Sequence, residues 1–147
     1  MQDQAGFWLS PQQKFQWKVQ QEALGRSTRP VCLVSLKGTV DAVRLRSALA
    51  DVVSRHEILR TVFRRQAGMK MPFQVVQDAI SVDWQQVDLS AFSDTEQRQR
   101  IGGVLEAEQW REFDPASAPV LRGLFFECGN DRSALILSVP SLCVDAP

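Results

Sequence analysis

The sequence predicts an α/β (α+β) fold in which a mixed sheet is backed by helices. Three observations predict it: short apolar runs bounded by proline or glycine indicate strands, capping sequences open helices between them, and two apolar runs near the C-terminus form a hairpin. Strands that alternate with helices favour a sheet with helices packed on its faces. At 147 residues, with 44% hydrophobic and 23% charged residues, the composition is that of one globular domain.

A first helix is predicted over residues 11–23. The Ser10 side chain can accept from the backbone N–H of Gln13, and the Gln13 side chain can reach back to the N–H of Ser10. Pro11 loses no hydrogen bond at the first helical position. Phe15 and Val19 share one face of the helix and Trp17 falls on another, so the helix is either covered on two sides or presents an aromatic at an interface.

The next elements are a strand and a second helix. Residues 31–36 form a short apolar run between Pro30 and Gly38, which predicts a strand buried on both faces. Asp41 offers an N-cap to the helix that follows. The apolar residues at helical spacing in that helix are Leu45, Ala48, Leu49, Val52 and Val53.

From residue 59 the hydrophobic period changes to two. One side carries Leu59, Thr61 and Phe63 and the other carries Arg60, Val62 and Arg64, which predicts a half-exposed strand. Two further strands are predicted over residues 73–77 and 81–87.

Ser93 and Glu96 form a capping box that opens a long helix, which ends before Phe113. The side of this helix that should face the sheet carries Ile101, Val104, Leu105 and Glu108. Residues 120–128 and 133–139 then form a hairpin across Gly129-Asn130-Asp131.

Charge and cysteine content exclude several classes of function. Seventeen basic and seventeen acidic residues cancel, which disfavours nucleic acid and anionic membranes as partners. The chain has no apolar run long enough to span a membrane and no signal peptide, so we expect a cytoplasmic protein. Cys32, Cys128 and Cys143 are widely separated and there is one histidine, so we expect reduced core or near-core thiols, no metal site and no directly bound cofactor.

The four tryptophans are scattered rather than spaced to stack on a ligand, which favours packing in the core or at a lobe interface. They are Trp8, Trp17, Trp84 and Trp110.

One motif is more specific than any pattern above. Arg55-His56-Glu57-Ile58-Leu59-Arg60-Thr61, followed by Phe63, resembles the Arg-His-Glu-x-Leu-Arg-Thr-x-Phe signature of the condensation domains of nonribosomal peptide synthetases. Further blocks resemble the family in the same order, at residues 9–13, 36–41, 72–76, 113–114 and 118–122. The resemblance runs from about residue 7 to the last residue.

The resemblance implies that residues 1–147 form the N-terminal lobe of a two-lobed, chloramphenicol-acetyltransferase-like fold, with the C-terminal lobe absent from this chain. In that family, donor and acceptor peptidyl carrier domains deliver phosphopantetheine-bound substrates to a tunnel between the lobes. A carrier-bound amine there attacks a carrier-bound acyl thioester. The implied partners are therefore these carrier domains, the C-terminal lobe and adjacent synthetase domains.

The family's His-His-x-x-x-Asp-Gly motif corresponds to residues 140–146, where this chain departs from it. The first histidine falls on Pro140, the catalytically important second one on Ser141, and the glycine on Ala146. Asp145 is kept. In the family this aspartate is mainly structural and pairs with an arginine of the C-terminal lobe, so here we expect a loop that is mobile or held by contacts with another molecule.

Neither Ser141 nor its neighbours replace the missing histidine. A serine hydroxyl titrates too high to act as a base, and neither a Gly-x-Ser-x-Gly elbow nor a nearby histidine makes Ser141 a nucleophile. Cys143, between two apolar residues, is expected to be a buried inert thiol. We expect His56 to pack and hydrogen-bond rather than to serve as a displaced base. Arg55 and Arg60 either orient the active-site loop or bridge to carboxylates such as that of Glu57.

Three hypotheses follow for function. The first is a condensation-like domain that handles carrier-bound acyl or peptidyl thioesters and is non-catalytic or atypical because of Ser141; the fragment alone is then inactive. The second is an active variant that forms amide bonds, when joined to its C-terminal lobe, through substrate proximity. The third is a stand-alone protein-interaction domain.

Overall fold

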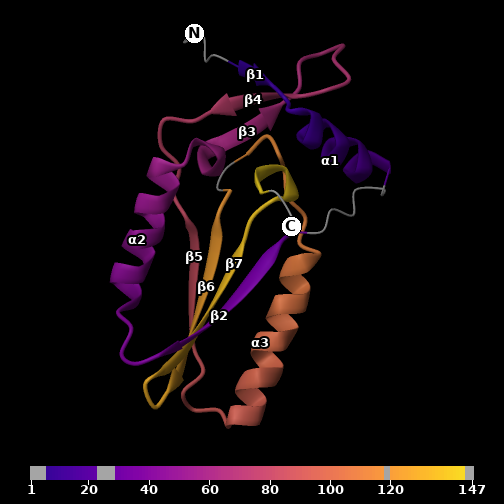
Figure 1. Ribbon diagram of the computed structural model, residues 1–147. Helices are drawn as coiled ribbons and strands as arrows, with labels where there is room; N and C mark the ends of the chain where they lie inside the picture. The colour runs from indigo at the N-terminus through magenta and orange to yellow at the C-terminus, as the bar shows by residue number, and fades with distance from the viewer. Residues whose placement is uncertain (1–5, 23–28, 118–119, 145–147) are drawn as a thin grey trace.

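The computed structural model describes residues 6–22, 29–117 and 120–144 (Figure 1). Its helices are α1 (Pro11–Glu22), α2 (Ala42–Arg55) and α3 (Asp94–Gln109), with two 3₁₀ turns, η1 (Glu57–Arg60) and η2 (Ser141–Cys143). Its strands are β1 (Gly6–Trp8), β2 (Val31–Lys37), β3 (Thr61–Arg64), β4 (Phe73–Val76), β5 (Asp83–Asp88), β6 (Arg122–Gly129) and β7 (Arg132–Ser138).

Two sheets organise the chain. The larger one has the order β2-β7-β6-β5, with β5 parallel to β6 and the other pairs antiparallel. The smaller one, β1-β4-β3, is antiparallel and lies at one end of the larger sheet (Figure 1). The predicted mixed sheet backed by helices is therefore confirmed.

Helix starts follow the predicted capping chemistry. The Ser10 N–H donates to Gln13 Oε1 at 2.9 Å, and the Gln13 N–H donates to Ser10 Oγ at 3.2 Å. Asp41 accepts from the first turn of α2, and Ser93 with Glu96 forms the capping box of α3. The β6–β7 hairpin also turns where predicted, with Asn130 and Asp131 both at positive φ.

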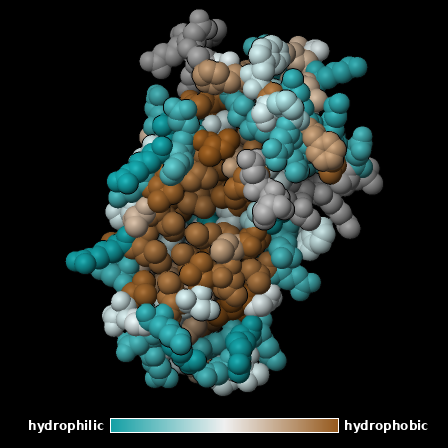
Figure 2. Space-filling view, viewed as in Figure 1, coloured by the Kyte–Doolittle hydropathy of each residue, from teal (hydrophilic) through white to brown (hydrophobic). Residues whose placement is uncertain are grey.

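The two faces of the larger sheet are covered differently. Helix α3 packs Ile101 and its neighbours on one face, where they form a core cluster with β6 and β7 side chains such as Phe126 and Ile136. Helix α2 lies on the other face, where Leu49 approaches Gly123 of β6. Beside α2, an apolar groove stays open over β7 and β2 (Figure 2). Its lining residues include Cys32, Leu49, Val52, Leu137, Val139 and Val144.

The prediction that residues 31–36 are buried on both faces is wrong. Strand β2 pairs only with β7 and forms an edge of the sheet, Leu33 remains 42% exposed, and Cys32 is exposed beside the open groove. The apolar β-branched run therefore predicted the strand correctly but not its burial, which depends on the elements that cover it.

The strand predicted from residue 59 begins later and is more buried than expected. Leu59 and Arg60 lie in η1, where Thr61 Oγ1 donates to the carbonyl of Glu57 at 2.7 Å. Val62, predicted to be on the exposed side, pairs with Val75 of β4 and is buried. An alternating hydrophobic pattern does not show where a preceding turn ends and the strand begins. It also does not show whether other elements cover both faces of the strand.

Within the described ranges, the helices are too short and too polar to cross a bilayer.

Candidate functional site

The candidate site is the turn η2, which follows the C-terminal end of β7. Pro140 precedes the turn and is fully buried, and the N–H of Cys143 donates to the carbonyl of Pro140 at 2.9 Å. Leu142 and Cys143 point into a core cluster. The other buried members of this cluster are Leu9, Trp17, Phe63 and Val120. Burial of Leu142 and Cys143 therefore fixes the position of the turn, and Ser141 lies on its partly exposed side.

One face of α1 holds this turn from outside. Trp17 is only 6% exposed and lies in the same cluster as Leu142. One turn to either side of it, Gln13 Nε2 donates to the carbonyl of Leu142 at 3.3 Å, and Gln20 Nε2 donates to Ser141 Oγ at 2.6 Å. The expectation that the loop is mobile or held by another molecule is therefore wrong for residues 140–144, because α1 of the same chain holds them.

The contributions of Gln13 and Gln20 to the site were not predicted. The available signal was the spacing of Gln13, Trp17 and Gln20 at i, i+4 and i+7, which places all three on one helical face. Phe15 and Val19, the apolar pair used to orient the helix, are instead exposed. The face of α1 that contacts the core is thus defined by one tryptophan with two amides beside it.

The turn brings no general base to Ser141 within the described residues. Its hydroxyl has one hydrogen-bonding side chain there, the Gln20 amide, which does not titrate. Burial raises the pKa of the Cys143 thiol to about 12, and the nearby Arg29 guanidinium lowers this pKa by a smaller amount. Cys143 is therefore a neutral thiol near neutral pH, as predicted, and cannot act as a thiolate nucleophile.

Alkylation should separate the cysteines by their burial. We expect iodoacetamide at pH 8 to modify the exposed Cys32 in the folded chain while Cys143, whose raised pKa keeps it protonated, stays unmodified. Peptide mass spectrometry of the alkylated protein would measure this. The same reaction in denaturant serves as the control, in which both thiols should react. Rapid modification of Cys143 under native conditions would contradict the burial described above.

The residues of the Arg-His-Glu block take positions apart from the Ser141 hydrogen bond. Arg60 donates from Nη1 to the Gln77 carbonyl at 2.6 Å and from Nε to the Ser54 carbonyl at 3.2 Å, so it joins the end of α2 to the loop after β4 rather than bridging to a carboxylate. Arg55 is exposed and forms no ion pair with another described residue.

His56 was expected to pack and to hydrogen-bond through its side chain. It is instead exposed at the C-cap of α2, where its backbone N–H donates to the Val52 carbonyl. In the part of the chain that the structure describes, its imidazole makes no hydrogen bond. Asp145 and Ala146 lie outside the described residues.

A buried ionic network anchors β7 just before the turn. Arg122 Nη1 lies 2.6 Å from Asp83 Oδ2, and Arg122 Nε lies 2.9 Å from Glu108 Oε1. Ser138 Oγ donates to the other Glu108 oxygen at 3.1 Å. Burial lowers the pKa of the Arg122 guanidinium, but hydrogen bonds to both carboxylates outweigh it and raise the pKa overall. The network ties α3, β5, β6 and β7 together two residues before Pro140.

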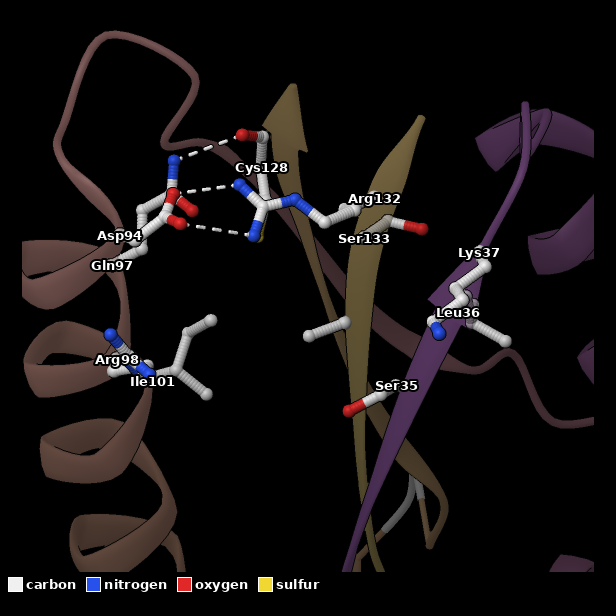
Figure 3. A pocket seen from close by; sticks show the side chains of 11 residues that line it. Ser35, Leu36, Lys37, Asp94, Gln97, Arg98, Ile101, Cys128, Arg132 and Ser133 are labelled. Atoms are coloured by element: carbon white, nitrogen blue, oxygen red, sulfur yellow. Dashed lines mark hydrogen bonds and ion pairs between the residues drawn. The ribbon is translucent and has the colours of Figure 1, made fainter. Parts of the chain in front are cut away.

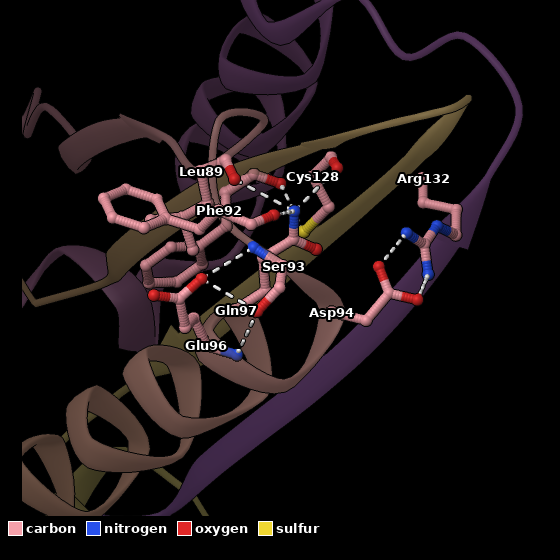
Figure 4. A network of polar contacts seen from close by, with 9 residues as sticks. Leu89, Phe92, Ser93, Asp94, Glu96, Gln97, Cys128 and Arg132 are labelled. Atoms are coloured by element: carbon pink, nitrogen blue, oxygen red, sulfur yellow. Dashed lines mark hydrogen bonds and ion pairs between the residues drawn. The ribbon is translucent and has the colours of Figure 1, made fainter.

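A second polar region, between the start of α3 and strands β2, β6 and β7, does not have the character of a reaction site (Figure 3). Asp94 and Arg132 pair with each other at 2.7 Å across its mouth. Gln97 Nε2 donates inward to the carbonyls of Cys128, Leu89 and Phe92 (Figure 4). The Asp94–Arg132 pair and the Gln97 amide therefore use their polar groups to join helix to sheet.

Replacing Gln97 with leucine should destabilise the chain. The substitution keeps the volume and leaves three carbonyls that accept from the Gln97 amide without that donor, so we expect a loss of about 1–3 kcal/mol in the free energy of unfolding. Urea denaturation followed by circular dichroism measures it. Gln99→Leu, on the exposed side of the same helix, is the matched control and should change the midpoint little. Equal shifts for the two variants would show that the buried amide is dispensable.

Among the described residues, no group of three or more histidine, cysteine, aspartate and glutamate side chains is placed to hold a metal ion.

Comparison with known proteins identifies the family. The condensation-domain family model matches residues 4–146, nearly the whole chain. The chain belongs to the condensation-domain family. Similar sequences occur in peptide synthetases. CymA, a probable non-canonical nonribosomal peptide synthetase of Salinispora arenicola, is 35% identical over 112 residues, which are 76% of this chain and 1% of CymA. The phosphinothricin tripeptide synthetase PhsC of Streptomyces viridochromogenes is 33% identical over 100 residues, which are 68% of this chain and 9% of PhsC.

Solved condensation domains share the fold. The condensation domain of the monacolin K polyketide synthase MokA superposes with a TM-score of 0.79 at 24% identity, over 92% of this chain and 30% of that one. The predicted chloramphenicol-acetyltransferase-like fold is thereby confirmed. The chain spans about a third of this solved relative and a far smaller share of the two synthetases.

Proposed function

We propose that residues 1–147 form the N-terminal lobe of a nonribosomal peptide synthetase condensation domain that receives carrier-bound acyl or peptidyl thioesters without catalysing their condensation. One observation carries the proposal: Ser141, at the family's catalytic histidine position, is held by the Gln20 amide and has no titratable partner among the described residues. An amide and a hydroxyl cannot take the proton of an attacking amine near neutral pH. Pro140, Asp145 and Ala146 are the remaining motif positions, with Asp145 in a structural role.

The proposed partners are donor and acceptor peptidyl carrier domains, whose phosphopantetheine arms present the thioesters, and a C-terminal lobe that completes the tunnel. Two observations support a domain that needs a second lobe. The chain covers about 30% of a solved condensation-domain chain. An entirely apolar groove, with no charged side chain in its lining, also lies open on the face shown in Figure 2. An apolar surface of this kind normally meets another part of a protein. We assign Arg55 and Arg60 supporting roles in the fold, Arg60 through its hydrogen bonds to backbone carbonyls.

Carrier binding tests this proposal. The complete condensation domain that contains this chain would be titrated with a carrier domain bearing the phosphopantetheine arm and with the same carrier lacking it. We expect binding that strengthens when the arm is present, because the arm enters the tunnel beside η2. If neither form of the carrier binds, the chain does not handle carrier-bound substrates and the proposal fails.

The alternative is an active variant that condenses its substrates through proximity and orientation. The observation that favours it is the fixed position of Ser141, because an ordered turn can hold a substrate in a reactive geometry. Replacing Ser141 with histidine separates the two. On our proposal the variant gains product formation or stays inactive, as in a degenerate enzyme that has lost its base. Loss of an existing activity on this substitution would instead show chemistry that depends on serine.

A further inference from the structure

The hydrogen bond between Gln20 and Ser141 has a direction, and the direction limits what Ser141 can do. Gln20 Nε2 donates to Ser141 Oγ at 2.6 Å, so one acceptor position of the hydroxyl is occupied. A hydroxyl has a single hydrogen, which must then point away from the donor. Within residues 6–22, 29–117 and 120–144, no acceptor hydrogen-bonds to it. Among the described residues, the Ser141 hydroxyl therefore keeps its hydrogen free to donate to a ligand.

The position of this donor is fixed on both sides. Behind it, Leu142 and Cys143 are buried in the core cluster, so the turn cannot rotate freely. Trp17 is buried in the same cluster and holds α1 against the turn, so Gln20 reaches Ser141 from a helix that is anchored in the core. Accepting a hydrogen bond also polarises the O–H group and makes it a better donor.

We infer that Gln20 is a positioning residue, which orients the Ser141 hydroxyl to donate a hydrogen bond to the carbonyl oxygen of a carrier-bound thioester. The inference rests on the proposed function and names the contact that the site makes. A thioester carbonyl is an acceptor and fits the free hydrogen of the Ser141 hydroxyl, whereas a protonated amine is only a donor and would have to use the remaining lone pair of Ser141 Oγ. The contact binds and orients the thioester, and no proton or acyl group is transferred to the protein.

Substituting glutamate for Gln20 reverses the hydrogen bond. A carboxylate has no hydrogen to donate, so the Ser141 hydroxyl would donate to it and turn away from the thioester. Gln20→Leu removes the partner without adding an acceptor, which leaves the hydroxyl unheld but still able to donate. If the Gln20–Ser141 hydrogen bond only supports the fold, both substitutions should reduce thioester binding about equally. If it orients the hydroxyl, Gln20→Glu should reduce thioester binding more than Gln20→Leu.

The experiment uses the complete condensation domain and a carrier domain with one of two modified arms. One arm carries an acetyl thioester, and the other carries an ethyl thioether of similar size that lacks the carbonyl. For the wild-type domain we expect the thioester form to bind about threefold to tenfold more tightly, the worth of one neutral hydrogen bond. Ser141→Ala should bring the ratio of the two affinities, thioester form over thioether form, to about one. Gln20→Glu should do the same at pH 7.5, and Gln20→Leu should reduce the ratio only in part.

Gln21→Glu is the matched control, because it adds the same charge at the next, exposed position of α1 and should leave the ratio unchanged. A second readout is the pH dependence of Gln20→Glu. Its ratio should recover as the pH falls toward the ordinary pKa of glutamate, about 4.3, where the carboxylic acid can donate again. If Gln20→Glu does not fold, Ser141→Ala and Gln20→Leu still give the comparison.

Three results would overturn the inference while leaving the proposed function intact. The first is binding of carriers to the wild-type domain with no preference for the carbonyl, and the second is a preference that survives Ser141→Ala. The third is equal ratios for Gln20→Glu and Gln20→Leu, which would show that Gln20 supports the fold and does not orient the hydroxyl. Failure of every carrier form to bind the wild-type domain would refute the proposed function and the inference together.

Discussion

Replacing Arg122 with methionine is expected to lower the free energy of unfolding by about 3–5 kcal/mol, because it breaks a buried ionic network. The guanidinium lies within 2.9 Å of Glu108 and 2.6 Å of Asp83. Glu108 is only 4% exposed, so the variant leaves its carboxylate buried, with a hydrogen bond from Ser138 and the half-exposed Arg111 guanidinium at 3.7 Å as its remaining close contacts. Urea denaturation of the chain, followed by circular dichroism, measures the change.

Arg132→Met is the matched control for this prediction. Arg132 also forms a close ion pair, at 2.7 Å from Asp94, but the two side chains are 42% and 62% exposed, and ion pairs at the surface contribute little. Its unfolding midpoint should stay near that of the unsubstituted chain. A second check is the double variant Arg122→Met with Glu108→Leu. It also removes the buried Glu108 carboxylate, so it should recover part of the lost free energy of unfolding. Similar midpoints for Arg122→Met and Arg132→Met would contradict the buried network.

Replacing Phe63 with alanine is expected to cost about 3–5 kcal/mol of stability, because it removes a large side chain from a closely packed core. Phe63 is 1% exposed and packs in the cluster that contains Leu142 and Cys143. The cavity would lie beneath η2, so the substitution should also increase alkylation of Cys143 under native conditions. Denaturation and peptide mass spectrometry would follow the two effects in the same samples.

Phe15→Ala provides the comparison for Phe63. Phe15 is 65% exposed on α1, so its truncation should change stability little and leave Cys143 protected. If Phe63→Ala lowered the stability without increasing alkylation of Cys143, the turn η2 would be held by α1 alone. If it had no effect on stability, the cluster would not be the support of the candidate site.

Local chemistry predicted much of the fold. The caps at Ser10, Asp41 and Ser93 each depend on residues within one helical turn, and all three form as predicted. The β6–β7 hairpin depends on Asn130 and Asp131 adopting positive φ, which is also local. Burial was predicted less well. The exposure of Leu33 depends on what covers the β2 edge, and the burial of Val62 depends on Val75 across the sheet.

The candidate site was located by family resemblance, and its geometry came from tertiary contacts that no sequence period reveals. The resemblance pointed to Ser141, but nothing local links it to Gln20, which lies 121 residues away in sequence. Glu108 was placed on the sheet-facing side of its helix, but nothing in the sequence linked it to Arg122, which lies 14 residues away. Arg60 was expected to meet a carboxylate and instead donates to backbone carbonyls, because the end of α2 and the loop after β4 present them.

The measurement that tests the central claim most directly is intact-protein mass spectrometry of carrier-bound product. The complete condensation domain would be incubated with a loaded donor carrier and a loaded acceptor carrier, and each carrier would be weighed for transfer. We expect that the carriers bind and that no condensed product forms beyond the level without the domain. Condensed product that forms with the wild-type domain and disappears with Ser141→Ala would contradict the proposed function and establish a condensation enzyme that works without the histidine.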